Sequence, residues 1–172
     1  MSIFEDINAK AQWLYGSNKL PFVVRAYFSD ATLALLLYRG MSFANKFKYA
    51  KPLALLLHKA NAVICGCVIG VGAQFGKRLI MLHSVGVVIN SAVVAGDDVT
   101  LESGVVIGAE KGKSPHIGNE VFFGSGAKVV GGLTIGNNVL VGANAVVVKD
   151  VPSDVVVGGV PAKIIRKRLE PI

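Results

Sequence analysis

The sequence predicts a mainly β protein: a parallel β-solenoid preceded by a small helical region. From Ile117 to Lys149 an apolar residue recurs every six residues, usually followed by glycine. That period matches neither an α-helix nor a single strand, which repeat at 3.6 and 2 residues. It is typical of a solenoid whose coils have three flat sides of about one hexapeptide each. The recurring apolar side chains are expected to point inward and to stack on their equivalents about 18 residues further on.

Residues 1–61 are expected to form the helical region. Ser2 to Glu5 fits a capping box, in which serine opens a helix and glutamate follows three residues later. Gly16 is expected to end this first helix. Its buried face is predicted from the helical spacing of four apolar residues: Ile3, Ile7, Ala11 and Leu14.

The segment from Phe22 to Tyr38 predicts one or two further helices, with Ser29 or Asp30 as an internal cap and Gly40 as the terminator. Residues 1–61 mix aromatic with basic side chains and carry a net charge of +5. These features predict either packing between subunits or contact with a membrane surface.

Residues 62–161 are expected to form the solenoid, whose register is interrupted twice. Met81 and Ile89 are eight residues apart, two more than one block, and His83 lies between them. Ile107 and Ile117 are ten apart, and the extra residues end in His116. A solenoid absorbs additional residues as a loop or bulge. Both histidines of the repeat therefore lie at interruptions, which are the places to expect chemistry.

Residues 162–172 are expected to form a short basic helix or tail. The solenoid itself has a charge of −1 and the tail +3, so the basic charge lies at the two ends of the chain. Basic ends favour anionic partners such as phosphates. Nucleic acid is not expected, because no recognition motif accompanies the charge. Cys65 and Cys67 are predicted to be small buried residues rather than metal ligands.

Although 52% of the residues are hydrophobic, no apolar run approaches the ~18 residues of a spanning helix. Glu5 and Asp6 stand where a cleavable signal would be basic. The prediction is a cytoplasmic protein, with peripheral contact at the inner face of the membrane as a further possibility.

The hexads resemble those of the left-handed β-helix acyltransferases, and residues 157–163, VGGVPAK, are similar to the closing motif of that family. Residues 82–90, LHSVGVVIN, resemble the active-site coil of its serine acetyltransferase branch. Residues 95–98 and 115–119 are most similar to the colanic-acid and other exopolysaccharide acetyltransferases of that branch. The resemblance covers roughly residues 60–168 and implies a left-handed solenoid, a homotrimer, acetyl-CoA as co-substrate and no metal.

The resemblance makes His83 the general base. This role is chemically sound, because an alcohol attacks a thioester only when a base takes its proton, and histidine suits that work near neutrality. His116 is the second candidate catalytic residue, as a loop residue near a subunit interface. The resemblance also places the pantetheine arm of acetyl-CoA against Gly124, Ser125, Gly126, Ala127, Gly142 and Ala143, and the nucleotide phosphates near Lys163, Arg166 and Lys167.

Several charged positions of the serine acetyltransferase pattern are replaced in this chain. Val68 stands where an aspartate would orient the base, and Leu82, Ser91 and Ser114 stand where acidic residues and a second histidine are expected. An amino-acid acceptor needs partners for both of its charges. The substitutions therefore predict a saccharide acceptor and negligible acetylation of serine. They leave the orienter of His83 open, either a backbone carbonyl or His116 of a neighbouring subunit.

Three alternatives stay open. The first is a serine O-acetyltransferase with an altered pocket. The second is a γ-type carbonic anhydrase, disfavoured because its zinc needs three imidazoles and the repeat holds two histidines. The third is a non-catalytic binding solenoid. Release of free CoA in the presence of an acceptor would separate the acetyltransferases from the other two.

Overall fold

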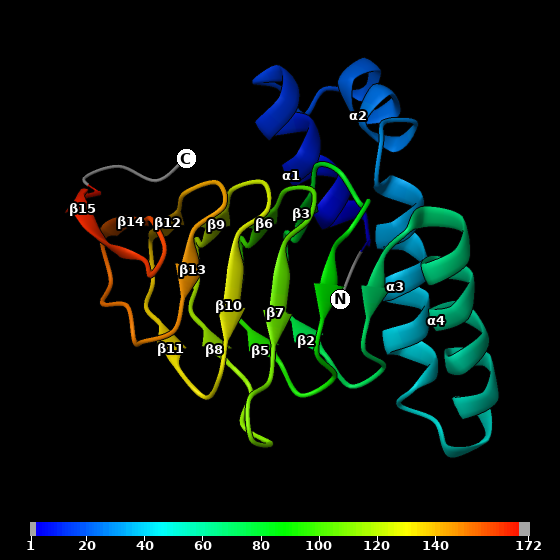
Figure 1. The fold of residues 1–172 in the computed structure, drawn as a ribbon. Helices are drawn as coiled ribbons and strands as arrows, with labels where there is room; N and C mark the ends of the chain where they lie inside the picture. Colours follow the sequence, from blue (N-terminus) through cyan, green and yellow to red (C-terminus); the bar gives the residue numbers. More distant parts are fainter. Residues whose placement is uncertain (1–2, 169–172) are drawn as a thin grey trace.

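The structure is a computed structural model that describes residues 3–168. Four α-helices stand at one end of a β-solenoid (Figure 1). They are α1 (Ile3–Tyr15), α2 (Leu20–Tyr27), α3 (Thr32–Ala44) and α4 (Lys51–Cys65), with a short 3-10 helix, η1 (Lys48–Ala50), before the last. Helix α1 is described from Ile3 onward, and the capping box predicted at Ser2 lies outside the described residues.

Helix α3 differs from the expectation, because it runs through Gly40 to Ala44. An added Cβ at Gly40 would touch Leu57 Cδ1 of α4 at 3.4 Å, so this glycine lies where the two helices pack closely. Burial of α3 offsets the cost of glycine inside a helix, about 1 kcal/mol. Its buried apolar side chains follow helical spacing: Ala34, Leu35, Tyr38, Met41 and Ala44. Helix α4 continues past residue 61 to Cys65, where Gly66 in the left-handed conformation ends it.

The solenoid has three parallel sheets, one for each side of the coil (Figure 1). The first sheet contains β1 (Val68–Ile69), β4 (Val88–Ile89), β7 (Val106–Gly108), β10 (Lys128–Val130) and β13 (Val146–Val147). The second contains β2 (Gln74–Phe75), β5 (Val94–Ala95), β8 (His116–Ile117) and β11 (Thr134–Ile135). The third contains β3 (Ile80–Met81), β6 (Thr100–Leu101), β9 (Phe122–Phe123), β12 (Val139–Val141), β14 (Val155–Gly158) and the added strand β15 (Lys163–Lys167).

The strand register confirms both interruptions of the repeat. In the first sheet Ile69 pairs with Ile89, Ile89 with Ile107, Ile107 with Val129 and Val129 with Val147. A coil without insertions has 18 residues, as between Ile89 and Ile107. The coil that contains His83, from Ile69 to Ile89, has two more residues. The coil from Ile107 to Val129, whose inserted residues end in His116, has four more. All five side chains of this column are buried and form the core expected from the period.

The C-terminal segment is a strand and not the predicted helix. Strand β15 pairs antiparallel with β14, at the outer edge of the third sheet. The last coil leaves the backbone groups of β14 open on that side, and an added strand satisfies them. The β-branched Ile164 and Ile165 suit an extended segment better than a helix.

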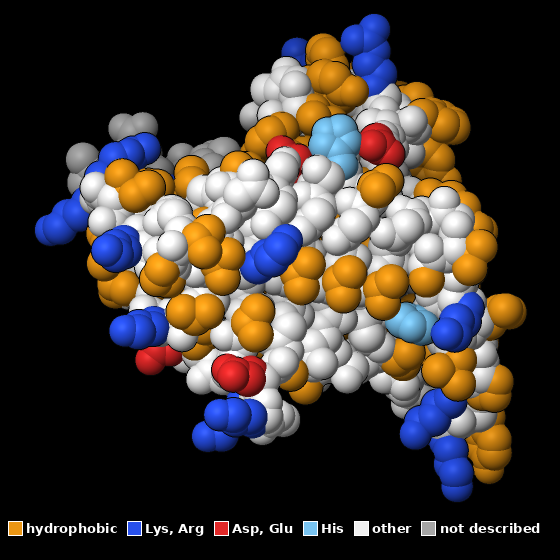
Figure 2. All heavy atoms as spheres, in the orientation of Figure 1, with side chains coloured by type: hydrophobic (Ala, Val, Ile, Leu, Met, Phe, Trp, Pro, Cys, Tyr) orange, Lys and Arg blue, Asp and Glu red, His pale blue; other side chains and the backbone are white. Residues whose placement is uncertain are grey.

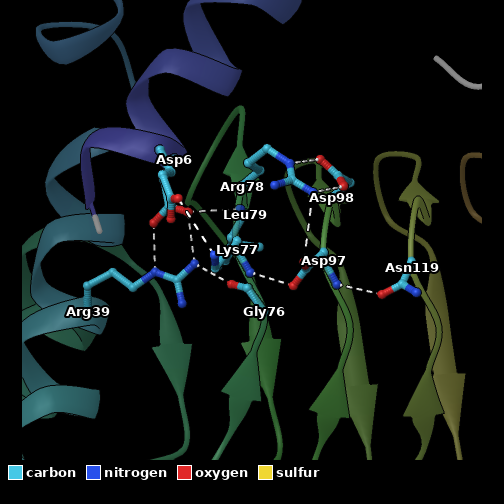
Figure 3. Close-up of polar contacts among 10 residues, drawn as sticks. Asp6, Arg39, Gly76, Lys77, Arg78, Leu79, Asp97, Asp98 and Asn119 are labelled. Carbon is cyan, nitrogen blue, oxygen red and sulfur yellow. Dashed lines mark hydrogen bonds and ion pairs between the residues drawn. The ribbon is translucent and has the colours of Figure 1, made fainter. Parts of the chain in front are cut away.

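A buried ion pair fastens the helices to the first coil (Figure 3). Arg39 of α3 donates to both carboxylate oxygens of Asp6 in α1, at 2.7 and 2.9 Å. Asp6 also accepts the backbone N–H of Leu79, and Arg39 donates to the carbonyls of Phe75 and Gly76. The Asp6 side chain is fully buried, and these contacts satisfy its charge.

A side-chain ladder follows the solenoid away from that ion pair, along the corner between the second and third sheets (Figure 3). Asp97 accepts the backbone N–H of Lys77, and Asn119 accepts that of Asp97. Arg78 forms a two-pronged ion pair with Asp98. These contacts join successive coils at a corner where strand pairing is absent.

Among the described residues, no single helix is long and apolar enough to cross a bilayer. Helices α2 and α3 reach that length and composition only together, across a bend of 82°.

Candidate functional site

His83 lies at the corner that joins β3 of the third sheet to β4 of the first. Its side chain is 56% exposed, and its Nδ1 is 2.8 Å from Oδ2 of Asp30. Because an ionised carboxylate only accepts hydrogen bonds, Nδ1 carries the proton in this contact. In the neutral ring Nε2 then has the free lone pair, which is the arrangement of a general base.

Asp30 comes from the turn between α2 and α3. Its Oδ1 accepts the backbone N–H of Ala31 at 2.9 Å, while Oδ2 faces His83. The pKa of Asp30 is lowered, chiefly by the hydrogen bond with His83; the Ala31 N–H and the charges of His83 and Lys10 act in the same direction, against partial burial. This carboxylate is therefore ionised at neutral pH, and within one chain it is the hydrogen-bond partner of the His83 ring.

Lys10 of α1 lies behind this turn and is almost completely buried. Its ammonium donates to the backbone carbonyl of Asp30 and, at 3.1 Å, to Oγ1 of Thr32. Burial lowers the pKa of Lys10 to about 8, although the charge of Asp30 opposes the shift. The helical spacing did not predict this position: Lys10 is buried, whereas Leu14, expected on the buried face, is 37% exposed.

A hollow of about 470 Å³ lies beside Asp30, between the α2–α3 turn, the end of α4 and the corner that follows His83. Burial raises the pKa of the Cys65 thiol in its wall, and the charge of Asp30 adds to the effect. This thiol is therefore protonated at neutral pH. Polar and apolar groups both line this hollow, which comprises Phe28, Ser29, Asp30, Ala31, Leu33, Ala34, Ile64, Cys65, Gly66, Ser84 and Val85.

The residues expected to hold the donor line the same corner as His83, further along the solenoid. Residues 124–127 join β9 to β10, and residues 142–145 join β12 to β13, so both turns connect the third sheet to the first. Each coil adds about 4.8 Å along this edge. The backbones of successive coils stack closely at this corner, since a Cβ added at Gly104 would lie 3.5 Å from the Cα of Gly126 in the next coil. Lys163, Arg166 and Lys167 are exposed on β15, beyond the last coil.

His116 is not brought to His83 within one chain. It is exposed on β8, which belongs to the second sheet, whereas the His83 corner joins the third sheet to the first. The extruded residues before it form a tight turn in which Glu110 and Lys113 exchange both backbone hydrogen bonds, at the corner between the first and second sheets. Ser114 donates to the side chain of Asn90 at 2.9 Å.

No group of three or more histidine, cysteine or acidic side chains in the described part of the chain is arranged to hold a metal ion. The His83 corner presents an imidazole next to a carboxylate.

Residues 114–149 match the family described as bacterial transferase hexapeptide (six repeats). Among curated proteins, the chain is 43% identical to the serine acetyltransferase of Staphylococcus xylosus over 127 residues, 72% of this chain and 58% of that enzyme. It is 41% identical to the serine acetyltransferase of Helicobacter pylori (strain J99) over 138 residues, 78% of this chain and 80% of that enzyme. The chain thus spans little more than half of the first of these relatives.

Solved structures of serine acetyltransferases have the same fold. The Neisseria gonorrhoeae enzyme superposes with a TM-score of 0.84 at 28% identity, covering 98% of this chain and 67% of that one. The soybean enzyme complexed with serine gives 0.80 at 28% identity, covering 92% and 67%. The Brucella abortus enzyme in complex with coenzyme A gives 0.83 at 27% identity, covering 94% and 66%.

These relatives overturn the prediction of a saccharide acceptor and of negligible serine acetylation, since proteins 40–43% identical to this chain are named serine acetyltransferases. They also give no support to the finer resemblance to exopolysaccharide acetyltransferases. The chain belongs to the hexapeptide-repeat transferase family, in the branch of the serine acetyltransferases.

Proposed function

We propose that this protein is an acetyl-CoA-dependent serine O-acetyltransferase with His83 as its general base. The observation that carries the proposal is the His83–Asp30 contact of 2.8 Å at the corner that also carries the glycine-rich turns. Relatives that share the fold are complexed with serine in one case and with coenzyme A in another.

In the proposed reaction, Nε2 of His83 takes the proton of the serine hydroxyl while its oxygen attacks the thioester carbonyl of acetyl-CoA. The tetrahedral intermediate collapses by breaking the carbon–sulfur bond. The imidazolium returns its proton to the departing thiolate, so the products are O-acetylserine and free CoA. The negative charge of Asp30 stabilises the imidazolium between the two proton transfers.

Carboxylates come to this corner from parts of the chain other than the positions of Val68 and Leu82. Asp30 comes from the helical region and contacts His83. Met81 pairs with Leu101, so Glu102 follows in the next coil beside Leu82, about 4.8 Å away along the edge. We infer that the half-buried Glu102 contributes to binding the ammonium group of serine.

An assay of CoA thiol release with L-serine tests the proposal. We expect release that depends on L-serine, together with O-acetylserine by mass spectrometry. L-alanine is the control, because it has the same charged groups and no hydroxyl to acetylate. Release with uncharged alcohols but not with L-serine would refute the assignment of the acceptor.

Replacing Glu102 with glutamine should raise the KM for serine by roughly 5–30-fold, the equivalent of about 1–2 kcal/mol for a partly exposed charge-assisted contact. The kcat and the KM for acetyl-CoA should change little, since the base and the donor turns stay intact. Initial rates over a range of serine concentrations measure the effect. Glu120→Gln, at the corner between the second and third sheets, is the matched control. An unchanged KM for serine would exclude Glu102 from acceptor binding.

A homotrimer is part of the proposal. Four of the five outward-facing positions of the first sheet are valines, namely Val68, Val88, Val106 and Val146, and hydrophobic side chains form a row across this face in Figure 2. A flat apolar side suits a contact that closes into a ring around a rotation axis. His83, exposed by more than half, would then face a neighbouring subunit.

Light scattering at micromolar concentration should give three times the chain mass of 18.0 kDa. Val88→Glu should dissociate the assembly, because it places a charge in the apolar row, whereas Gln74→Glu on the second sheet should not. A monomeric unmodified protein would contradict this part of the proposal.

Membrane contact and a cytoplasmic location remain predictions. Hydrophobic side chains gather over the helical end, with basic ones beside them (Figure 2). Several are strongly exposed, such as Phe28, Phe43 and Tyr49.

A further inference from the structure

We propose that Asp30 and Lys10 are positioning residues for His83, so that the helical region, and not the solenoid, sets the orientation of the base. The inference rests on the proposed function of His83. Asp30 acts by direct contact with the ring, and Lys10 acts through Asp30.

The Asp30 carboxylate is directed by its own turn. Oδ1 is held by the N–H of Ala31, which leaves Oδ2 for His83. Ala31 is buried and has a positive φ of 62°, a conformation that costs a non-glycine residue roughly 1–2 kcal/mol. Such a turn persists only when its surroundings hold it. The side chain of Asp30 is 64% exposed, so its direction depends on the backbone of this turn.

Lys10 supplies part of that restraint. Its buried ammonium donates to the carbonyl of Asp30 and to Thr32, and Thr32 in turn donates to the carbonyl of Ala26 at 2.8 Å. Ser29 donates to the same carbonyl at 2.7 Å. Burying an ammonium is unfavourable unless its hydrogen bonds are satisfied. The Lys10 ammonium therefore restrains Asp30 and Thr32, which stand at the turn that carries the Asp30 carboxylate.

These contacts connect helix α1 to both ends of β3, where the second end carries His83. Asp6 and Lys10 lie four residues apart in α1, on one face of the helix. Asp6 binds the backbone of Leu79 just before β3, and His83 follows β3 in the chain. Helix α1 therefore holds the solenoid before β3 and, through Lys10 and Asp30, the imidazole after it. A displacement of α1 would move the carboxylate relative to His83.

The ionisable groups on the elements around this base are Asp30 of the α2–α3 turn, Lys10 of α1, Cys65 at the end of α4 and Glu102 in the next coil. Asp30 is the one in contact with the ring. Removing its carboxylate should therefore slow the reaction, because the imidazole loses the group that holds it in place.

The experiment is a double-mutant cycle with Asp30→Asn and Lys10→Met, measured as kcat and KM. We expect Asp30→Asn to lower kcat by roughly 10–100-fold, the range found when a group that orients a metal-bound histidine is removed. The KM for acetyl-CoA should be unchanged. Asp30→Glu should recover part of the loss, because it restores the charge.

Lys10→Met keeps the apolar length of the side chain and should lower kcat by ~3–10-fold, since the turn then holds Asp30 less firmly. In the Asp30→Asn background the same change should have no further effect on kcat, because Lys10 acts only through Asp30. Lys59→Met, an exposed lysine of α4, is the matched control. Thermal unfolding of each variant separates loss of fold from loss of orientation.

Two outcomes would overturn the inference: wild-type kcat in Asp30→Asn, or additive losses in the double mutant. His83→Asn separates these failures from failure of the proposed function. If His83→Asn is inactive while Asp30→Asn behaves as wild type, only the positioning role is wrong. If His83→Asn is fully active, the proposed base itself is wrong.

Discussion

Replacing His83 with alanine should lower kcat for acetyl transfer by ~10²–10⁴-fold, the usual contribution of a positioned general base. The fold should persist, because the side chain is 56% exposed and lies outside the inward columns. Affinity for CoA should change little, since the proposed donor turns lie further along the corner. Steady-state kinetics with serine, together with CoA binding by calorimetry, measure both quantities.

His83→Asn should be as inactive as His83→Ala, because an amide of similar size does not take a proton. His116→Ala should have a milder effect, as expected of a residue on another side of the coil that acts at most from a neighbouring subunit. Near-normal kcat in His83→Ala, with a large loss in His116→Ala, would place the base on the second sheet instead.

Replacing Asp6 with alanine should lower the free energy of unfolding by about 3–5 kcal/mol, the range found when one partner of a buried ion pair is removed. The change leaves the mostly buried Arg39 guanidinium without its carboxylate and the Leu79 N–H without its acceptor. It also removes a hydrogen bond that joins α1 to the first coil (Figure 3). Urea unfolding followed by circular dichroism measures the loss.

Glu5→Ala is the control for this prediction, because it removes the adjacent carboxylate from the same helix. Glu5 and Lys77 are 3.8 Å apart and largely exposed, so their ion pair should contribute less than about 1 kcal/mol. Equal losses in the two variants would show that the buried pair does not stabilise the junction between helices and solenoid.

The period of the sequence predicted the solenoid, because each coil must bury one apolar side chain at the same place on each side. This requirement leaves a repeat that is visible without any knowledge of tertiary contacts. It also explains why the two insertions could be located: residues beyond the 18 of a regular coil must leave the stack. The sequence thus placed His83 and the extruded turn at corners, and the strand register agrees.

The details of the helical region and of the C-terminus were less predictable. Gly40 was expected to end a helix, but close packing against Leu57 keeps it inside α3. The basic tail was expected to be helical, but the open edge of β14 makes β15 a strand. In both cases a local preference is overridden by a neighbouring element, and nothing in the segment itself reveals that neighbour.

By itself, then, the sequence determined the coils, their core columns and the corner that carries His83, because these follow from a short-range repeat. Only the tertiary structure decided which group contacts the imidazole. Asp30 is 53 residues from His83 in the chain and belongs to a non-repetitive helical region, so no spacing connects the two. The same is true of Lys10, whose burial depends on the turn packed over α1. The contact between Asp30 and His83 depends on how the helical region docks on the solenoid. That docking follows from the shape and charge of the two surfaces, as at the buried Asp6–Arg39 pair, which binds the backbone of the first coil.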